Sequence, residues 1–133
     1  MEYKKIQYDN LNARQKENFN FQKVAAVLAE YGFNCIRLSD DWRGADFIAC
    51  HINGDFLKIQ LKGRLTINRI YEGSDIYIAF PEQGQWYLYP HDDVMSLLEP
   101  SIKDTRSWQD GEGYSWPRLS IEIRNLMGKY LIS

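Results

Sequence analysis

Two short apolar runs around an Asn-Gly pair constrain this chain more than any other feature. Residues 46–50 and 56–62 flank Asn53-Gly54, and an Asn-Gly pair between two such runs is a strong local signal of a β-hairpin. Apolar and polar residues alternate along 56–62, which is typical of a half-buried strand. The sequence therefore predicts a hairpin whose second strand presents Gln60 and Lys62 on one face.

Patterns on either side of the hairpin predict helices and further strands. Apolar residues recur at helical spacing from Glu17 to Tyr31, and Gly32 is a natural stop. Further strands are predicted over 33–38, 75–80 and 85–89, a polar loop over 39–44, a short helix over 91–99, a loop over 100–113 and a closing helix from about Ser115. We therefore expect an α/β (α+β) fold with a mixed central β-sheet of about five strands and helices packed on it.

The length of the chain indicates one domain. Its 133 residues suffice for one hydrophobic core and are too few for two ordinary ones. We expect a single domain over 1–133, with an N-terminal arm or short strand at 1–16, a core at 17–98, and a loop and C-terminal helix at 99–133.

Composition excludes several classes of protein. A chain with 44% hydrophobic and 26% charged residues is neither disordered nor of low complexity. The longest aliphatic stretch, Val24–Ala29, is far shorter than the roughly 20 residues that cross a bilayer, and the charged amino terminus is unlike a signal peptide. Cys35 and Cys50 form no metal or disulfide pattern. We expect a cytoplasmic protein with no membrane partner and two buried free thiols.

The charge of the chain is unevenly distributed. Its net charge of −2 argues against a nucleic-acid partner, but residues 1–71 carry 11 Lys and Arg against 8 Asp and Glu, whereas residues 72–133 carry 5 against 10. The segment 56–71 has no carboxylate and holds the main basic stretch: Lys58, Lys62, Arg64 and Arg69. This stretch is either a DNA-binding surface or a solvated strand edge protected by lysines.

Asp46, Gln60 and Lys62 form the pattern D-x13-Q-x-K, which suits metal-assisted chemistry on a phosphate. A carboxylate and an amide oxygen are hard ligands of the kind that Mg²⁺ prefers, and the Leu61 carbonyl could add another. A lysine beside them can orient or deprotonate water and neutralise charge on the phosphate. The alternative is structural: Asp46 caps a strand, Gln60 bonds across the sheet, and Lys62 is a solubilising edge residue.

The register of the hairpin tests this pattern. A two-residue Asn53-Gly54 turn would place Asp46 opposite Leu61, pointing into the core. A three-residue loop that includes Asp55 and a bulge would place Asp46 opposite Lys62, on the Gln60 face. We expect the second arrangement.

The segments 44–49 and 57–64, which read Gly-Ala-Asp-Phe-Ile-Ala and Leu-Lys-Ile-Gln-Leu-Lys-Gly-Arg, resemble the core of the PD-(D/E)xK nuclease superfamily, in the branch with Gln for the second acid. The resemblance covers residues 17–98, and Trp86–Pro90 is similar to the strands that follow this motif in homing endonucleases and related small nucleases. It implies a restriction-endonuclease-like core and a metal-dependent DNA endonuclease that hydrolyses phosphodiester bonds with Mg²⁺, or alternatively Mn²⁺. Asp46, Gln60 and Lys62 would be catalytic.

The first helix of this family often supplies a metal-linked Glu, and Glu17 lies on the inward face of the predicted helix. Glu17 is therefore a candidate third metal ligand beside Asp46 and Gln60, or else a first-turn carboxylate stabilised by the helix dipole. We expect Glu17 or Asn20 to lie above the site.

DNA is the expected partner, with RNA left open. Arg43, Lys58, Arg64 and Arg69 would hold the backbone, and Trp42 is the tryptophan placed where a strand could pass. A domain this small grips little DNA, so a homodimer is the natural way to engage two strands. The competing hypothesis is a catalytically inactive nuclease-fold module that binds DNA or a protein partner.

Overall fold

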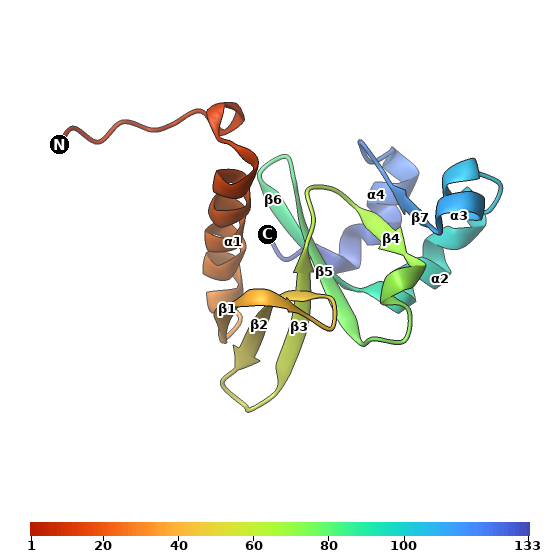
Figure 1. Cartoon of the computed structure of the whole chain (residues 1–133), viewed down its shortest axis with the longest axis horizontal. Coiled ribbons are helices and arrows are strands. Elements are labelled where there is room, and N and C mark those ends of the chain that lie inside the picture. The colour runs from red at the N-terminus through yellow and green to blue at the C-terminus, as the bar shows by residue number, and fades with distance from the viewer.

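The computed structural model describes residues 1–133 and contains a central mixed sheet covered on both faces (Figure 1). The strands of this sheet lie in the order β1-β2-β3-β5-β6, and only the β3–β5 pair is parallel. The helices and strands are α1 (Ala13–Ala29), β1 (Phe33–Trp42), β2 (Ala45–His51), β3 (Phe56–Leu61), β4 (Thr66–Asn68), β5 (Ile76–Glu82), β6 (Gln85–Pro90), α2 (His91–Ile102), α3 (Arg106–Gly111), β7 (Gly113–Ser115) and α4 (Ile121–Met127). The predicted mixed sheet of about five strands with packed helices is confirmed.

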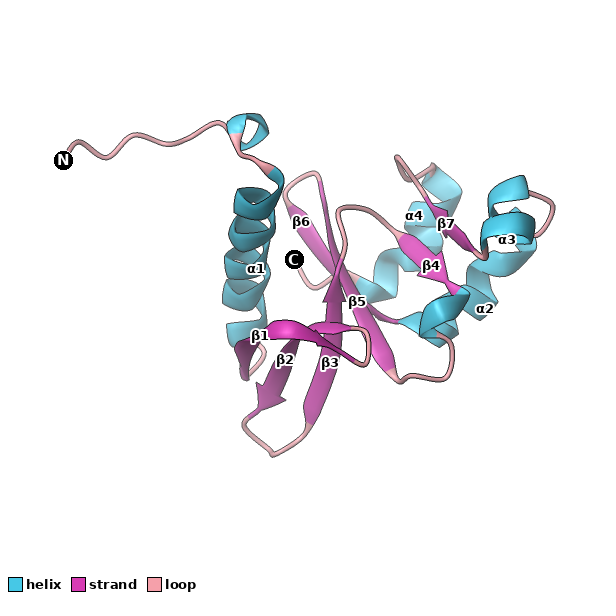
Figure 2. Ribbon diagram, in the orientation of Figure 1, coloured by secondary structure: helices cyan, strands magenta, loops and turns pink.

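The sheet separates two hydrophobic clusters. The smaller lies under α1, where Val24 and Leu28 pack on Phe47 and Ile59. The larger lies on the other face, where α2, α4 and the two-stranded β4–β7 sheet cover β5 and β6 (Figure 2). α1 therefore stands alone on its side of the sheet, and the C-terminal half of the chain supplies the cover for the opposite side.

The β2–β3 hairpin has a three-residue loop, but not the expected one. Its loop is 52–54, because Gly54 takes the left-handed position (φ +99°) and His51 pairs with Asp55. Phe47 pairs with Ile59, so the register is two positions from the expected one and brings Asp46 level with Gln60 rather than Lys62. The prediction that Asp46 lies opposite Lys62 was wrong, because Asp55 accepts from His51 N–H across the hairpin and so lies outside the loop.

β1 is longer than expected and bulges. The predicted loop over 39–44 is strand as far as Trp42, and Arg43 and Gly44, both with positive φ, then form a tight turn into β2. Arg37 pairs with Phe47 and Trp42 with Ala45, so residues 38–41 lie opposite the single residue Asp46. The polar residues of this segment suggested a loop because β1 is an exposed edge strand, which needs few apolar residues.

α1 begins four residues earlier than predicted. Asn12 caps it with a reciprocal bond to Gln15, a capping box that fixes the start at Ala13. Before it, residues 1–7 are extended and exposed and project from the body of the molecule (Figure 1). The arm is therefore shorter than the predicted 1–16 segment.

The C-terminal region contains more structure than expected. α3 and β7 fall mainly in the predicted loop over 100–113, and α4 begins at Ile121, capped by Ser120, rather than near Ser115. No helix has both the length and the apolar character that a membrane span requires.

Candidate functional site

Asp46 lies where the strand pairing of β2 is interrupted on both sides. The bulge of β1 faces it on one side, and on the other the backbone N–H of Leu61 donates to Asp46 Oδ2 at 2.8 Å. The carboxylate thus takes the place of a strand carbonyl as the acceptor for β3. This interruption leaves Asp46 half-buried at the end of the sheet, with its second oxygen free of protein hydrogen bonds.

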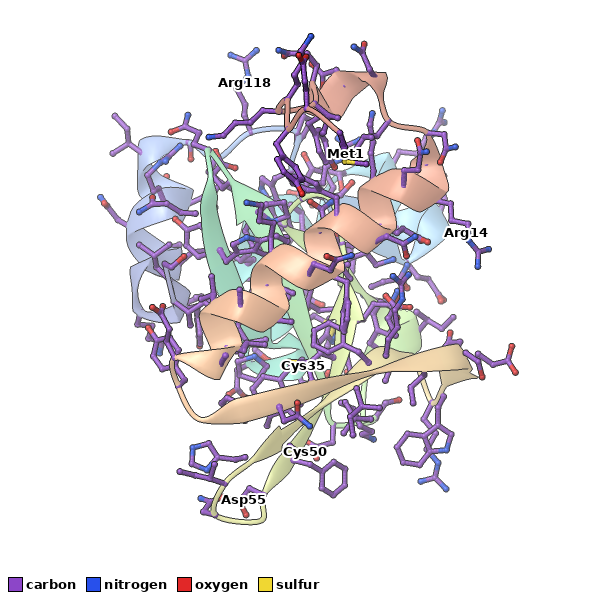
Figure 3. All side chains as sticks on the ribbon, turned by 90° about the vertical axis from the view of Figure 1, so that its left-hand side faces the viewer. Met1, Arg14, Cys35, Cys50, Asp55 and Arg118 are labelled. Carbon is purple, nitrogen blue, oxygen red and sulfur yellow. The ribbon has the colours of Figure 1, made fainter.

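A cleft of about 550 Å³ opens beside Asp46. Its walls are the first turns of α1, the bulge of β1 and the ends of β2 and β3. Arg14, on the rim, lies toward the start of α1, far from Asp55 at the hairpin tip (Figure 3). Gln60 and Lys62 do not line this cleft, so the structure gathers the three predicted residues at one end of the sheet without placing them in one cavity.

Gln60 carries an unsatisfied polar atom. Its Oε1 is buried and has no hydrogen-bond partner, which is uncommon because leaving a buried acceptor unpaired costs about 1–3 kcal/mol. Gln60 lies one position beyond the Phe47–Ile59 pair, level with Asp46. The Gln60 amide oxygen is therefore an unpaired acceptor level with Asp46.

Lys62 is positioned by an aromatic ring. Its Nζ lies 5.5 Å from the centroid of Tyr71, and its backbone N–H continues the parallel ladder by donating to the carbonyl of Ala79. Tyr71 in turn packs edge-on against His91 at 5.4 Å. The lysine thus projects from the end of β3 across a ring supplied by the crossover between β4 and β5.

The groups around Asp46 shift the pKa of its carboxyl in opposite directions. Burial raises the pKa of the Asp46 carboxyl above its ordinary value, and the negative charges of Asp41 and Glu17 raise that pKa further. The Leu61 N–H and the Lys62 ammonium act in the opposite direction, and the net change is upward. The Leu61 N–H and Lys62 therefore do not fully offset the cost of ionising Asp46 in the folded protein.

Of the two α1 residues expected above the site, Glu17 lies at the cleft and Asn20 does not line it. Glu17 lines the cleft but is exposed, and its carboxylate lies 3.7 Å from the guanidinium of Arg37. Asn20 donates to the hydroxyl of Tyr8, near the arm. The carboxylate of Glu17 is thus paired with Arg37 at the cleft, and Asn20 is held by the arm.

The residues at this end of the sheet fit a magnesium ion with few protein ligands. No three His, Cys, Asp or Glu side chains gather into a group that could hold a metal. The oxygen donors are the Asp46 carboxylate and the orphaned Gln60 amide, and Mg²⁺ characteristically binds one or two protein oxygens and completes its shell with water and phosphate.

The four predicted DNA-binding residues are not equally free. Arg43 stacks on Trp42 at the β1–β2 turn, and Arg64 is exposed. Lys58 donates to the carbonyl of Ser74. Arg69 lies over the ring of Trp108, 3.8 Å from the carboxylate of Glu99, so it already has an anionic partner.

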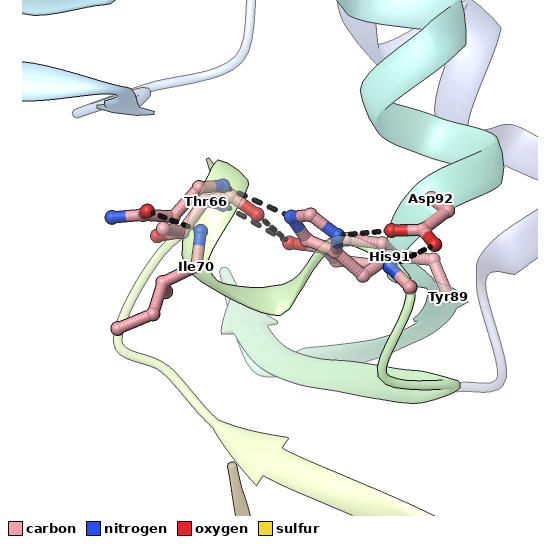
Figure 4. Close-up of polar contacts among 7 residues, drawn as sticks. Thr66, Ile70, Tyr89, His91 and Asp92 are labelled. Carbon is pink, nitrogen blue, oxygen red and sulfur yellow. Dashed lines mark hydrogen bonds and ion pairs between the residues drawn. The ribbon is translucent and has the colours of Figure 1, made fainter. Parts of the chain in front are cut away.

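The Tyr71 ring packs against His91, and His91 belongs to a polar network that the sequence did not reveal (Figure 4). His91 is fully buried, accepts from the backbone N–H of Asn68 and contacts Asp92 at 2.9 Å. Tyr89 bonds both backbone groups of Thr66. The sequence showed only that His91 lies at the start of a predicted helix. Nothing in the local pattern indicated that its side chain is buried.

The two cysteines are free, as the sequence predicted, but they are half-buried and not fully buried. Burial, with a smaller contribution from Cys50, raises the pKa of Cys35 to about 11. Neither takes part in the site.

Comparisons with known proteins give a fold and no family. No family model matches the chain, and no curated protein matches it. The fold is similar to that of a solved homing endonuclease structure. That structure is the bacterial homing endonuclease I-Ssp6803I: the two superpose with a TM-score of 0.56 at 16% sequence identity, over 91% of this chain and 87% of the other. The chain therefore has a nuclease-like fold.

Proposed function

We propose that this protein is a metal-dependent DNA endonuclease of the PD-(D/E)xK type that hydrolyses phosphodiester bonds. The observation that carries the proposal is the Asp46 carboxylate bonded to Leu61 N–H at the end of the strand that bears Gln60 and Lys62. The buried, unpartnered Gln60 Oε1 supports it, and so does the similarity of the fold to a bacterial homing endonuclease.

Each residue has a distinct task. Asp46 and Gln60 would hold Mg²⁺, or Mn²⁺ in its place, with the Leu61 carbonyl as a further donor; the ion supplies charge neutralisation and an acidified water. Lys62 orients the attacking water and stabilises the negative charge that develops on the phosphate. Glu17, whose charge already acts on Asp46, is the candidate third ligand and would have to leave Arg37.

Substrate binding falls to the basic residues. Arg43, Lys58 and Arg64 contact the phosphate backbone, and Arg69 contributes less because Glu99 pairs with it. A homodimer would present two such sites to two strands, and a cytoplasmic location remains part of the proposal. RNA is the alternative polymer.

Lys62→Ala tests catalysis apart from binding. The variant should lose cleavage of labelled duplex DNA in Mg²⁺ by about 100-fold or more, as when a transition-state donor is removed. Its DNA affinity, measured in Ca²⁺, should fall only a few-fold, because one phosphate contact among several is lost. Lys129→Ala is the matched control, since Lys129 is also beside a tyrosine ring but at the far end of the chain. Equal cutting by Lys62→Ala and the wild type would refute the assignment.

One observation favours an inactive module instead. The site has a single acidic side chain bonded at the end of β3, and no metal-holding group of three acidic, His or Cys residues. DNA binding without cutting in Mg²⁺ or Mn²⁺ would support that function, and a gain of cutting in Gln60→Glu would identify a decayed nuclease with an intact scaffold. Absence of DNA binding at low salt would favour a protein partner.

A further inference from the structure

A second pocket lies apart from Asp46. It encloses about 330 Å³ between the β1–β2 turn and the first residues of β3 and β5, within the size range of small-ligand sites. It shares no wall residue with the cleft at Asp46. The turn reaches this position because β1 curls across the sheet after its bulge, as the transverse course of β1 in Figure 1 illustrates.

Aromatic side chains on the wall of this pocket are exposed. Trp42 is 45% and Phe56 56% accessible, whereas the other three tryptophans of the chain are buried. Tyr77 adds a half-buried third aromatic residue. Planar side chains left open at a pocket are the usual platforms for nucleobases, because every base has a face that stacks on them.

Charged groups frame the same pocket. Arg43 lies 5.5 Å from the ring centroid of Trp42, and Lys58 extends to the carbonyl of Ser74. Asp75, the neighbour of Ser74 on the wall, is exposed and offers an acceptor to a base edge. Two cations and one acceptor around aromatic rings match a nucleotide: phosphate for the cations, and an amino-bearing base for the rings and the carboxylate.

The pocket and the candidate catalytic end lie along one strand. Phe56, Lys58, Gln60 and Lys62 are every second residue from the start to just beyond the end of β3, so alternation places them on one face. Lys58 is four residues from Lys62, about 13 Å at roughly 3.3 Å per residue, which equals about four base-pair rises along the axis of B-form DNA. A strand held at Lys62 therefore reaches the pocket within a few nucleotides.

We propose that this pocket binds one unpaired nucleobase of the DNA strand, stacked on Trp42 and Phe56, a few nucleotides from the reacting phosphate. The inference rests on the proposed nuclease function and deepens it: the substrate contains an unpaired base, as in an overhang, a fork or an extrahelical nucleotide. Paired bases do not enter, because in a duplex both faces of a base are already stacked.

The test compares the affinity of the protein for two DNA ligands that share one backbone, one with bases in its overhang and one without them. Duplex DNA with a four-nucleotide single-stranded end is bound in Ca²⁺, so that cutting plays no part, and is compared with the same duplex whose overhang is abasic. The wild type should bind the base-bearing overhang about 5- to 150-fold more tightly, the range for stacking of one base. Trp42→Ala should abolish this ratio, and Trp42→Phe should retain most of it.

Controls separate the pocket from general binding. Tyr3→Ala removes an exposed aromatic residue of the arm and should leave the ratio unchanged. Because Trp42 is the exposed tryptophan, the base-bearing overhang should also protect wild-type fluorescence from acrylamide, and the abasic overhang should not.

The outcomes are distinct. Equal affinity of the wild type for both overhangs would refute the proposal that the pocket binds a nucleobase, even if the protein cuts DNA. A retained base preference without any cutting supports the pocket and removes the proposed catalysis. A preference that survives in Trp42→Ala overturns the assignment to this pocket.

Discussion

Asp46 occupies a position that lowers the stability of the folded chain. Burial and the charges of Asp41 and Glu17 raise its pKa, so ionising this carboxyl costs more free energy in the folded chain than in the unfolded chain. Asp46→Asn keeps an oxygen for the Leu61 N–H and should increase the free energy of unfolding at pH 7 by about 0.5–2 kcal/mol. Urea denaturation measures this, with the exposed Asp104→Asn as control.

The pH dependence of this gain has a defined sign. A carboxyl whose pKa is raised on folding favours the folded state when protonated and loses that contribution as pH rises through the folded pKa. The advantage of Asp46→Asn should therefore shrink as pH falls through the raised pKa. A variant less stable than the wild type at pH 7 would contradict the argument.

Magnesium should relieve the same cost. An ion that binds only the folded protein stabilises it by about 2.7 kcal/mol at 100 times its dissociation constant. Mg²⁺ should therefore raise the melting temperature of the wild type and leave that of Asp46→Asn unchanged. Gln60→Glu should melt lower without the ion, because it buries a second charge beside Asp46, and show the larger shift with it. Thermal melts at matched ionic strength, with K⁺ as control, decide this.

Tyr71 should act on Lys62 through its ring and not its hydroxyl. Tyr71→Phe keeps the face 5.5 Å from the ammonium, whereas Tyr71→Leu removes it, which is worth about 0.5–1 kcal/mol at an exposed site. Tyr71→Leu should lower kcat about two- to five-fold at unchanged KM, and Tyr71→Phe should cut normally. Equal loss in both variants would assign the effect to the hydroxyl.

At the scale of elements, the network at the start of α2 holds the β4–β5 crossover in place. His91 accepts from Asn68 N–H, and Asp92 accepts from Gly73 N–H, so both hydrogen bonds link α2 to the crossover. His91→Ala leaves a buried donor unpaired and opens a cavity, and should cost at least 2 kcal/mol of unfolding free energy. Ser96→Ala, an exposed change on the same helix, should cost little. Chemical denaturation of the two variants checks this.

The elements also show how far the sequence predicted the structure. The Asn-Gly pair identified the hairpin, and strand alternation grouped Gln60 with Lys62. The register depended on which residue closes the loop: Gly54 in the left-handed position does so, and Asp55 already pairs with His51. α3 and the β4–β7 pair were missed because short elements are stabilised by tertiary contacts, here the burial of Trp108 and Ile67. Tyr71 reaches Lys62 only through the crossover, which no local pattern encodes.

At the scale of the whole molecule, positive charge gathers in the half of the chain that holds the site. DNA affinity should fall with salt at a slope of about −0.9 per phosphate contact. Lys58→Ala and Arg64→Ala should each reduce the slope by about one unit, and Arg69→Ala by less, because Glu99 already pairs with it. Fluorescence anisotropy between 50 and 200 mM salt measures the slopes, and an affinity insensitive to salt would contradict a phosphate-binding surface.

The two edges of the sheet differ in a way that governs how copies of the molecule can assemble. The outer edge of β6 is closed by the last residues of the chain, where Leu131 bridges Tyr87 and Ile132 bonds Trp86. The outer edge of β1 has no such cover. Strand addition can therefore extend the sheet in one direction only. Two copies that meet β1 to β1 use up both open edges, so association by this route ends at a pair and cannot propagate into a fibre.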